Sequence, residues 1–309
     1  INSDGTDIAD TKDQQSKPCY DQQALMRQYP VISQICDAMI ELGWGPYQND
    51  HEDANGQFEM NWDFDDALKT ADRHVFFKFM VKSIAELHGM RATFMPKPFS
   101  NLTGNGCHSH ISLWNLSGTQ NLFDGNNDSR ELGLSSLAYQ FLGGIMHSAD
   151  CLAAIFNPAI NSYKRINAPR TLSGATWSPD SITYGGNNRT HMIRVPEAGR
   201  FELRLMDGAA NPYLMQAGIL ACGLDGIEGN RDPGDPLDIN MYELGEDIKG
   251  YKQLPHNLLD AIRLFEGSDV LRERLGSELV DAFVKLKKNQ WDDYTSHLTK
   301  WELDNTLDC

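Results

Sequence analysis

The stretch of this chain that decides its fold reads Asn49-Asp50-His51-Glu52-Asp53-Ala54-Asn55-Gly56-Gln57-Phe58-Glu59-Met60-Asn61. An Asn-Gly pair is the strongest short-range signal for a tight hairpin, because a type I′ turn needs positive φ at both central residues. With Asn55 and Gly56 at those positions, Glu52 is predicted to lie directly opposite Glu59. The two carboxylates then stand roughly 5 Å apart at Cβ, where like charges destabilise a ladder.

This facing pair has two interpretations. Hard divalent cations such as Mg²⁺ or Mn²⁺ take carboxylate oxygens, and one of them would relieve the repulsion between Glu52 and Glu59. The alternative is two solvated glutamates on an exposed hairpin. The hairpin alone leaves both interpretations open.

Length and charge exclude several classes of protein. The 309 residues can bury a large core as one big domain or two modest ones. The net charge of −16 repels nucleic acid and anionic membranes, so we expect neither as a partner. No apolar run approaches the ~20 residues of a membrane span. The six cysteines are scattered without a CxxC pair, which favours reduced thiols in a cytoplasmic protein.

Helices are predicted on both sides of the hairpin. A helix over 20–42 is broken or kinked by Pro30. Asp63 or Asp65 is predicted to cap a long helix over 66–88, which Gly89 ends. The apolar residues predicted to form the core side of this helix are Ala67, Ala71, Val75, Phe76, Phe77, Phe79, Met80, Ile84 and Leu87. The remaining predictions are a buried strand over 91–98, helices over 131–155, 213–227 and 256–306, and a polar loop over 228–252.

A Gly-rich loop carries the next candidate site. Gly104 and Gly106 lead into a predicted strand in which His108, His110 and Ser112 share one face, because side chains alternate with a period of two. Two histidines on one face behind such a loop favour contact with a ligand or a phosphate over two structural histidines. A zinc site is the weaker interpretation, because HExxH and CxxC patterns are absent.

Cationic residues gather in the following segments. Lys164 and Arg165 end a short motif, and the irregular stretch 166–187 after it has the length of a functional flap or a disordered loop. Two short strands are predicted over 188–196 and 200–204. On the second strand Arg200, Glu202 and Arg204 share one face, which indicates either a surface ladder of alternating charges or an anion-and-metal site.

Four segments in this order carry a family resemblance. They are Glu52-Asp53-Ala54-Asn55-Gly56-Gln57-Phe58-Glu59, Lys97-Pro98 with Gly104-Asn105-Gly106-Cys107-His108-Ser109-His110-Ile111-Ser112-Leu113, Asn157-Pro158 with Asn161-Ser162-Tyr163-Lys164-Arg165, and Asn188-Arg189 with Arg194-Val195-Pro196, Glu202-Leu203-Arg204 and Asn211-Pro212-Tyr213-Leu214. The chain resembles the catalytic domain of glutamine synthetase, most closely its bacterial type III branch, which is similar to γ-glutamylmethylamide-forming enzymes. The resemblance implies an α+β fold: a curved, mainly antiparallel sheet lined by helices, with ATP and glutamate entering from opposite ends.

The resemblance also implies a reaction and a set of roles. The reaction is ATP-dependent ligation of L-glutamate to ammonia through γ-glutamyl phosphate, giving glutamine for nitrogen assimilation, or to methylamine as the alternative. Two or more Mg²⁺ or Mn²⁺ ions and a homo-oligomer, a dodecamer by resemblance, are implied. By matching position, Glu52 and Glu59 hold one metal, and His108 and Glu202 hold the second. Gly104, Arg165 and Arg204 bind glutamate, and His110, Ser112, Arg194 and Arg200 contact nucleotide. Arg189 contacts the transferring phosphoryl group and, with Arg165, is the catalytic residue.

Three departures from the family pattern bear on these roles. The sequence starts at Ile1 without the strand that carries one more Glu for each metal and without the N-terminal β-grasp domain. We therefore expect residues 1–309 to be an incomplete catalytic domain that is inactive alone. The segment 165–169 lacks the Glu that closes the amine site in many relatives, for which Asp180 is a substitute. Thr103 stands where many relatives have Asn.

Two other classes of protein remain open. One is a non-catalytic relative, a fragment or oligomeric binding protein that kept the fold; the joint presence of Glu52, Glu59, His108 and Glu202 argues against it. The other is a phosphotransferase of the guanidino-kinase type, which shares the sheet but does not need the carboxylate hairpin.

Overall fold

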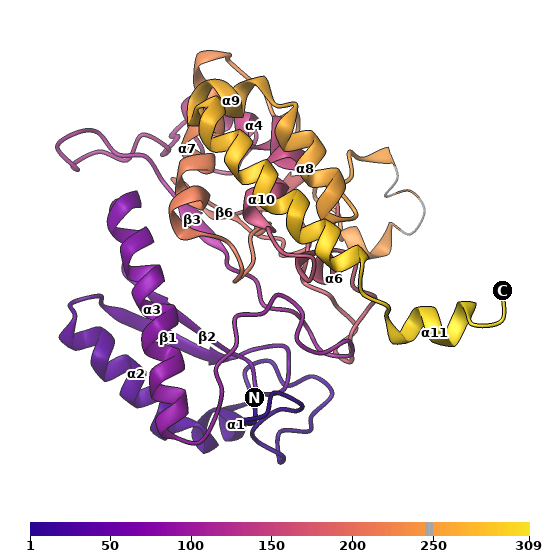
Figure 1. The fold of residues 1–309 in the computed structure, drawn as a ribbon. Coiled ribbons are helices and arrows are strands. Elements are labelled where there is room, and N and C mark those ends of the chain that lie inside the picture. Colours follow the sequence, from indigo (N-terminus) through magenta and orange to yellow (C-terminus); the bar gives the residue numbers. More distant parts are fainter. Residues whose placement is uncertain (245–246, 248–249) are drawn as a thin grey trace.

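The computed structural model describes residues 1–244, 247 and 250–309, and it has an α+β architecture of small, mainly antiparallel sheets lined by helices. Figure 1 shows the N-terminal elements, in indigo and purple, below most of the remaining helices and the second sheet, while the last helix, in yellow, lies at the lower right. The lower part consists of α1 (Gln22–Arg27), α2 (Tyr29–Glu41), β1 (Pro46–His51), β2 (Phe58–Trp62) and α3 (Ala67–Leu87). The predicted interruption near Pro30 is confirmed, because α1 and α2 are separated at Gln28 and Pro30 lies in the first turn of α2.

The hairpin of β1 and β2 forms, but its predicted register is wrong. Glu59 lies opposite Asp50 rather than Glu52, and the backbone N–H of Glu52 donates to Gln57 O at 2.9 Å. The connection is therefore four residues long, 53–56, instead of two. Because the offset is even, Asp50, Glu52 and Glu59 still share one face of the ladder.

A contact from the N-terminal segment explains this register. Asp13 accepts hydrogen bonds from Asn55 Nδ2 at 3.0 Å and from the Gly56 N–H at 2.7 Å. Its carboxylate also lies 2.6 Å from Nε2 of the buried His51. Of the two central turn residues, Asn55 and Gly56, only Gly56 has a positive φ, of 69°, and the Gln57 N–H donates to Ala54 O, as in a type II turn. The side chain of Asn55 is held by Asp13 instead of supporting a type I′ turn.

The long helix α3 forms as predicted, but its cap and its buried side differ. Asp66, not Asp63 or Asp65, accepts the Lys69 N–H, while Asp65 pairs with Lys69 and Arg73. Gly89 follows the helix with a φ of 70°, as predicted. The exposed set includes Val75, Phe76, Phe79 and Leu87, so the prediction that they are core is wrong. The buried residues of α3 are Ala71, Arg73, Met80, Ile84 and Ala85.

The lower part has a small core of its own. Ile35 and Met39 of α2, Trp44, and Met80 and Ile84 of α3 form one buried cluster. Phe77 is half-buried against it and packs on Trp62 with ring centroids 5.0 Å apart. The apolar residues of α3 lie on all sides of the helix, so periodicity alone cannot identify the side that α2 and the hairpin cover.

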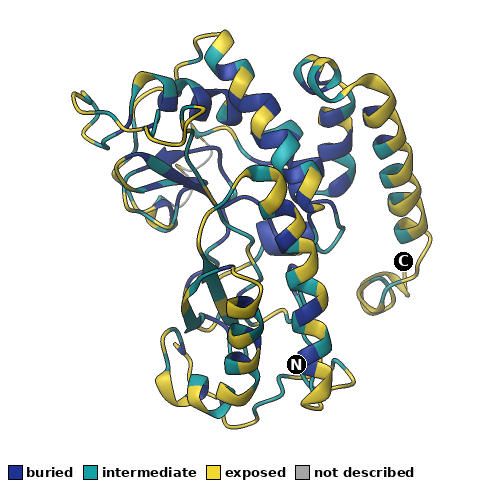
Figure 2. Cartoon of the chain, turned by 90° about the vertical axis from the view of Figure 1, so that its left-hand side faces the viewer, coloured by how far each residue is buried: buried dark blue, intermediate teal, exposed yellow. Residues whose placement is uncertain are grey.

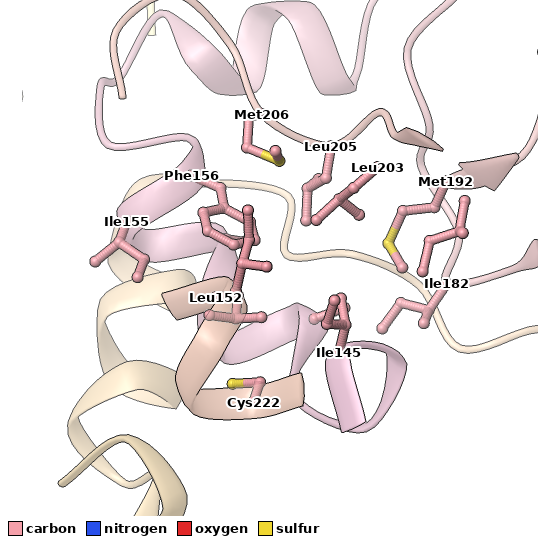
Figure 3. Packing of buried hydrophobic residues seen from close by; sticks show 14 of the residues in the cluster. Ile145, Leu152, Ile155, Phe156, Ile182, Met192, Leu203, Leu205, Met206 and Cys222 are labelled. Carbon is pink, nitrogen blue, oxygen red and sulfur yellow. The ribbon is translucent and has the colours of Figure 1, made fainter. Parts of the chain in front are cut away.

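The upper part contains the larger core. Its helices are α4 (Ser136–His147), α5 (Ala149–Phe156), α6 (Ser162–Ile166), α7 (Pro212–Glu228), η1 (Met241–Glu243), α8 (Leu258–Glu266), α9 (Asp269–Leu275), α10 (Ser277–Thr295) and α11 (Lys300–Thr306). Figure 3 shows Ile145, Leu152 and Phe156 packed with Leu203, Leu205 and Met206. Helices α4 and α7 can approach closely because Gly144 has no side chain. A Cβ at this position would meet Cys222 O at 2.0 Å and Gly226 Cα at 2.6 Å.

The second sheet crosses this core with strand order β3-β6-β5-β4. Its strands are β3 (Ser109–Ile111), β4 (Tyr184–Gly185), β5 (Ile193–Glu197) and β6 (Arg200–Leu203), and only the β4–β5 pair is parallel. The buried strand predicted over 91–98 is wrong, since this segment has no regular structure. The predicted helix 131–155 is two helices that meet at Ser148. The predicted helix 256–306 is divided into α8 to α11.

Burial follows this division of the molecule. Figure 2 shows buried residues concentrated in the upper helices and the second sheet, while α10 and α11 are largely exposed. Positions 245–246 and 248–249 of the predicted loop 228–252 lie outside the described residues. No helix among those the structure describes has the length and apolar character needed to cross a membrane.

Candidate active site

Glu202 stands at the centre of the second sheet. It lies opposite His110 of β3 on one side and opposite Arg194 of β5 on the other. Arg204 Nη1 donates to its Oε1 at 2.6 Å and Arg194 Nη1 to its Oε2 at 2.8 Å. Glu202 and Arg204 are each only 3% exposed. The alternating charges of β6 are therefore part of a buried site and not a surface ladder.

The charges around Glu202 keep its carboxylate ionised. Burial alone would raise its pKa, but the hydrogen bond with His108 and the charge of Arg204 hold the pKa well below its usual range. His108 Nδ1 lies 3.2 Å from Glu202 Oε1. Burial, reinforced by Arg204, lowers the pKa of His108 to about 4. The imidazole is thus neutral at pH 7, the form in which histidine binds metals.

The nucleotide-side candidates lie along the same sheet. Arg200 Nη1 contacts His110 Nδ1, and Arg200 Nε donates to Glu197 Oε1 at 2.6 Å. Arg194 also donates to Asn187 Oδ1, from Nε at 2.9 Å and from Nη2 at 2.6 Å. Ser112, just beyond β3, accepts from Trp114 Nε1 at 3.0 Å. The sheet therefore brings His110, Arg194 and Arg200 together, with Ser112 at the end of the same strand.

The Gly-rich loop lies directly on Arg165. A Cβ on Gly104 would meet Pro96 O at 2.4 Å and Arg165 Cγ at 3.1 Å, and one on Gly106 would meet His108 Nε2 at 2.5 Å. Position 104 therefore needs glycine, and a side chain at position 106 would displace the ring of His108. Arg165 is 2% exposed and donates to Leu205 O at 2.9 Å and to Arg204 O at 3.2 Å. These bonds occupy two of its five N–H donors.

The acidic side chains of the hairpin form a second cluster. Burial raises the pKa of Glu52 to about 7, and the charges of Glu59 and then Asp50 add to this shift. Glu59 is exposed and accepts from Asn61 Nδ2 at 3.1 Å. The repulsion expected across this hairpin is present, although the residue directly opposite Glu59 is Asp50.

Two features connect the hairpin with the second sheet. Gln57 Nε2 donates to Gly104 O at 3.1 Å and to Asn105 Oδ1 at 2.8 Å. Burial raises the pKa of Cys19 to about 11, and the charge of Glu52 adds to this shift while that of the exposed Arg189 opposes it. Burial lowers the pKa of Arg204, and the charge of Arg189 contributes to that shift. Arg189 therefore lies within electrostatic reach of Cys19 and of Arg204, the partner of Glu202.

The donor chemistry fits divalent metals, but the number of ligands is small. Carboxylate oxygens at Glu52 and Glu59 suit Mg²⁺ or Mn²⁺, and the pair of His108 and Glu202 suits Mn²⁺ as well. Each carboxylate oxygen has two lone pairs, so Glu202 can accept a metal beside its arginine partners. Within the described part of the chain, no group of three or more His, Cys, Asp or Glu residues could hold a metal ion. Each predicted metal site therefore has two candidate ligands here.

Sequence reasoning missed Asp13 and Asn187 and gave Asp53 no role. Asp53 is buried and accepts from Thr103 and Ser173, so it joins the hairpin to the loop 166–187. Its position beside Glu52 was a signal that could have been used. The predicted substitute Asp180 accepts from Ser181 Oγ at 2.6 Å, and its backbone carbonyl accepts from the Leu254 N–H at 2.7 Å.

Comparison with known proteins identifies the class to which this fold and site belong. The family model described as "Glutamine synthetase, catalytic domain" matches residues 2–306. The chain belongs to this family, as its motifs predicted. It is 62% identical over 308 residues to a glutamine synthetase of Rhizobium meliloti (strain 1021), covering all of this chain and 70% of that protein. It is 45% identical over 303 residues to a glutamate–methylamine ligase of Methyloversatilis universalis, covering 97% of this chain and 68% of that protein.

Solved structures agree with this assignment. A GmaS/ADP complex superposes with a TM-score of 0.94 at 64% identity, and GmaS without ligand superposes with a TM-score of 0.93 at 62% identity. Each covers all of this chain, which corresponds to 70% of the solved chain. The predicted glutamine synthetase-type α+β fold is confirmed.

Proposed function

We propose that this protein is an ATP-dependent ligase that joins L-glutamate to ammonia through γ-glutamyl phosphate, giving glutamine. The observation that carries the proposal is the buried Glu202 with His108, Arg194 and Arg204, joined through the Gly-rich loop to the acidic hairpin. Transfer of phosphate to a carboxylate brings anions together, so it needs guanidinium groups and cation-binding carboxylates in one site. Two relatives named glutamine synthetase match this chain over its full length.

The proposed nucleotide site consists of His110, Ser112, Arg194 and Arg200. Guanidinium groups bind phosphate oxygens with directed hydrogen bonds, and both arginines lie on neighbouring strands with side chains that reach the same surface. The ADP named in the similar GmaS complex supports a nucleotide as a ligand of this fold.

The proposed glutamate site consists of Gly104, Arg165 and Arg204. Arg165 retains N–H donors beyond those that bind backbone carbonyls, and the absence of a side chain at Gly104 lets the loop lie against Arg165. Arg189 is assigned to the transferring phosphoryl group by its place in the Asn188-Arg189 motif. A fixed positive charge there stabilises charge that develops in the transition state.

Glu52 and Glu59 are proposed to hold one metal, and His108 and Glu202 the other. Mg²⁺ or Mn²⁺ bound there would neutralise phosphate charge and orient in-line transfer. Because each proposed site has two candidate ligands among the described residues, we infer that further ligands complete both sites in the active protein and that residues 1–309 alone have no turnover. A cytoplasmic location and a homo-oligomer, a dodecamer by family resemblance, are part of the same proposal.

The test is steady-state kinetics of the full-length protein with ammonia and with methylamine, together with hydroxylamine trapping of the acyl phosphate. We expect glutamate-dependent ATP cleavage, trapped hydroxamate and a higher kcat/KM with ammonia. Absence of hydroxamate would remove the ligase assignment, leaving a phosphotransferase or a non-catalytic relative. Robust turnover by residues 1–309 alone would contradict the inference about missing ligands.

Methylamine is the second candidate for the amine. The 45% identical glutamate–methylamine ligase favours it. The absence of Glu from the segment 165–169 bears on the amine without deciding between ammonia and methylamine. A kcat/KM ratio above ~10-fold for methylamine, equivalent to about 1.4 kcal/mol, would replace ammonia as the assigned substrate.

A further inference from the structure

Asp53 connects three segments that are distant in sequence. Its Oδ2 accepts the hydroxyl of Thr103 at 2.5 Å and the hydroxyl of Ser173 at 2.5 Å. Thr171 Oγ1 lies 3.3 Å from the Thr103 hydroxyl and 3.0 Å from the Ser173 hydroxyl. The acidic hairpin, the Gly-rich loop and the loop 166–187 are therefore joined at one carboxylate.

This junction is buried. Asp53 is 8% exposed and Thr103 is 6% exposed, so water competes little for the carboxylate. Hydrogen bonds to an ionised acceptor are stronger than those between neutral groups, and more so in a dry environment. The carboxylate of Asp53 therefore attaches the loop 166–187 firmly to the hairpin and the Gly-rich loop.

The attachment acts where the proposed site is built. Asp53 directly follows Glu52, and Thr103 directly precedes Gly104. The loop is also attached on both sides of Ser173, where Arg170 Nη2 donates to Tyr242 O at 2.7 Å and the Trp177 N–H donates to Tyr242 Oη at 2.6 Å. Release of Ser173 from Asp53 would free the part of the loop beside the hairpin while the Tyr242 attachment remains.

We propose that Asp53 is a positioning residue that latches the loop 166–187 over the glutamyl site and keeps water from the acyl phosphate. This inference rests on the proposed function. When water instead of the amine attacks the acyl carbon, the C–O bond to phosphate breaks, and glutamate and inorganic phosphate are released. If the loop is no longer held by Asp53, ATP is therefore consumed without formation of the amide.

The test uses the full-length protein with Asp53→Asn and Ser173→Ala, and Ser296→Ala as the matched control. Ser296 is exposed at the end of α10, and its hydroxyl donates only locally, to Asp293 O. The measured quantity is phosphate released per amide formed. We expect a ratio close to unity for the parent and the control and a rise of about threefold or more for both latch variants. Asp53→Glu should restore part of the coupling.

Hydrogen exchange of residues 166–177 without substrates provides a readout independent of activity. We expect exchange about fivefold or more faster in Ser173→Ala than in the parent, because the loop opens locally. Ser173→Ala changes only the loop side of the junction, so it tests the latch even if Asp53→Asn does not fold. Unchanged exchange and an unchanged ratio in Ser173→Ala would overturn the latch. Faster exchange in a protein that traps no hydroxamate would instead overturn the ligase assignment alone.

Discussion

At the scale of single residues, buried charge decides which side chains matter. Glu202 has both oxygens bonded to arginines inside the second sheet, whereas Glu197 on the neighbouring strand is 65% exposed and bonds Arg200 at the surface. Removing one partner of a buried pair leaves the others uncompensated. Removing a partner at the surface changes little, because water replaces it.

Glu202→Gln should therefore lower the free energy of unfolding by roughly 3–5 kcal/mol. Glu197→Gln, its matched control, should change it by less than about 1 kcal/mol. Urea unfolding of both variants under identical conditions measures the difference. Equal and small changes in the two variants would mean that the charge of Glu202 is not needed to stabilise the buried arginines around it.

At Glu52 the same reasoning predicts that removal of the charge stabilises the protein. At pH 8 its carboxylate is charged and half-buried beside Glu59 and Asp50, so we expect Glu52→Gln to raise the free energy of unfolding by roughly 1–2 kcal/mol in the presence of chelator. Added Mn²⁺ should stabilise the parent more than the variant, because the variant lacks one proposed ligand.

Thermal unfolding with EDTA and with Mn²⁺ measures both effects, and Glu41→Gln on the exposed surface of α2 is the control. A lower melting temperature of Glu52→Gln in EDTA would contradict the repulsion. An equal response of the two proteins to Mn²⁺ would contradict the metal assignment.

At the scale of elements, α3 links the two parts of the molecule. Lys78 Nζ donates to Gly208 O at 2.6 Å, while Met80 and Ile84 of the same helix enter the lower core. His74, one turn before Lys78, lies with Nε2 4.0 Å from Cys107 Sγ. Burial, reinforced by Lys78, lowers the pKa of His74 to about 4.

This shift predicts a pH dependence of stability. The unfolded chain binds a proton at His74 below about pH 6.5, whereas the folded chain binds it only near pH 4, so stability falls as the pH decreases between these values. His74→Gln should remove roughly 1–3 kcal/mol of this loss.

Urea unfolding of His74→Gln and the parent at pH 7.5 and 5.0 measures the difference between their slopes. His88→Gln, at the exposed end of the same helix, is the control. Parallel pH profiles of parent and His74→Gln would contradict the prediction.

At the scale of the whole molecule, two cores of unequal size support the site. The lower cluster contains few fully buried side chains, and the upper cluster spans α4, α5, α7 and the second sheet. The smaller core has less apolar area removed from water, so it opens more readily. The proposed metal pair Glu52 and Glu59 belongs to the part with the weaker core.

We expect amide hydrogens of α2 and of β1–β2 to exchange before those of α4 and α7. Met39→Ala, at a fully buried position, should cost roughly 2–5 kcal/mol locally and accelerate exchange in the lower part. Hydrogen-exchange mass spectrometry measures both. An equal acceleration in α4 and α7 would indicate one cooperative unit instead of two.

Much of this site could be predicted from local sequence patterns. The period of two predicted that Arg200, Glu202 and Arg204 share one face, and the family motifs identified the chain's family. The assignment of each site residue to a ligand remains a prediction. These inferences succeeded because turn propensity, alternation and motif spacing are properties of a few consecutive residues.

The sequence by itself therefore determined the family, the α+β fold and the side of the hairpin on which Glu52 and Glu59 lie. Only the tertiary structure decided the hairpin register, the exposure of Phe76 and Phe79, and the junction at Asp53. The reason is that these features depend on distant partners: Asp13 is 43 residues from Gly56, and Ser173 is 120 residues from Asp53. Local periodicity contains no information about which residue distant in sequence contacts a given side chain.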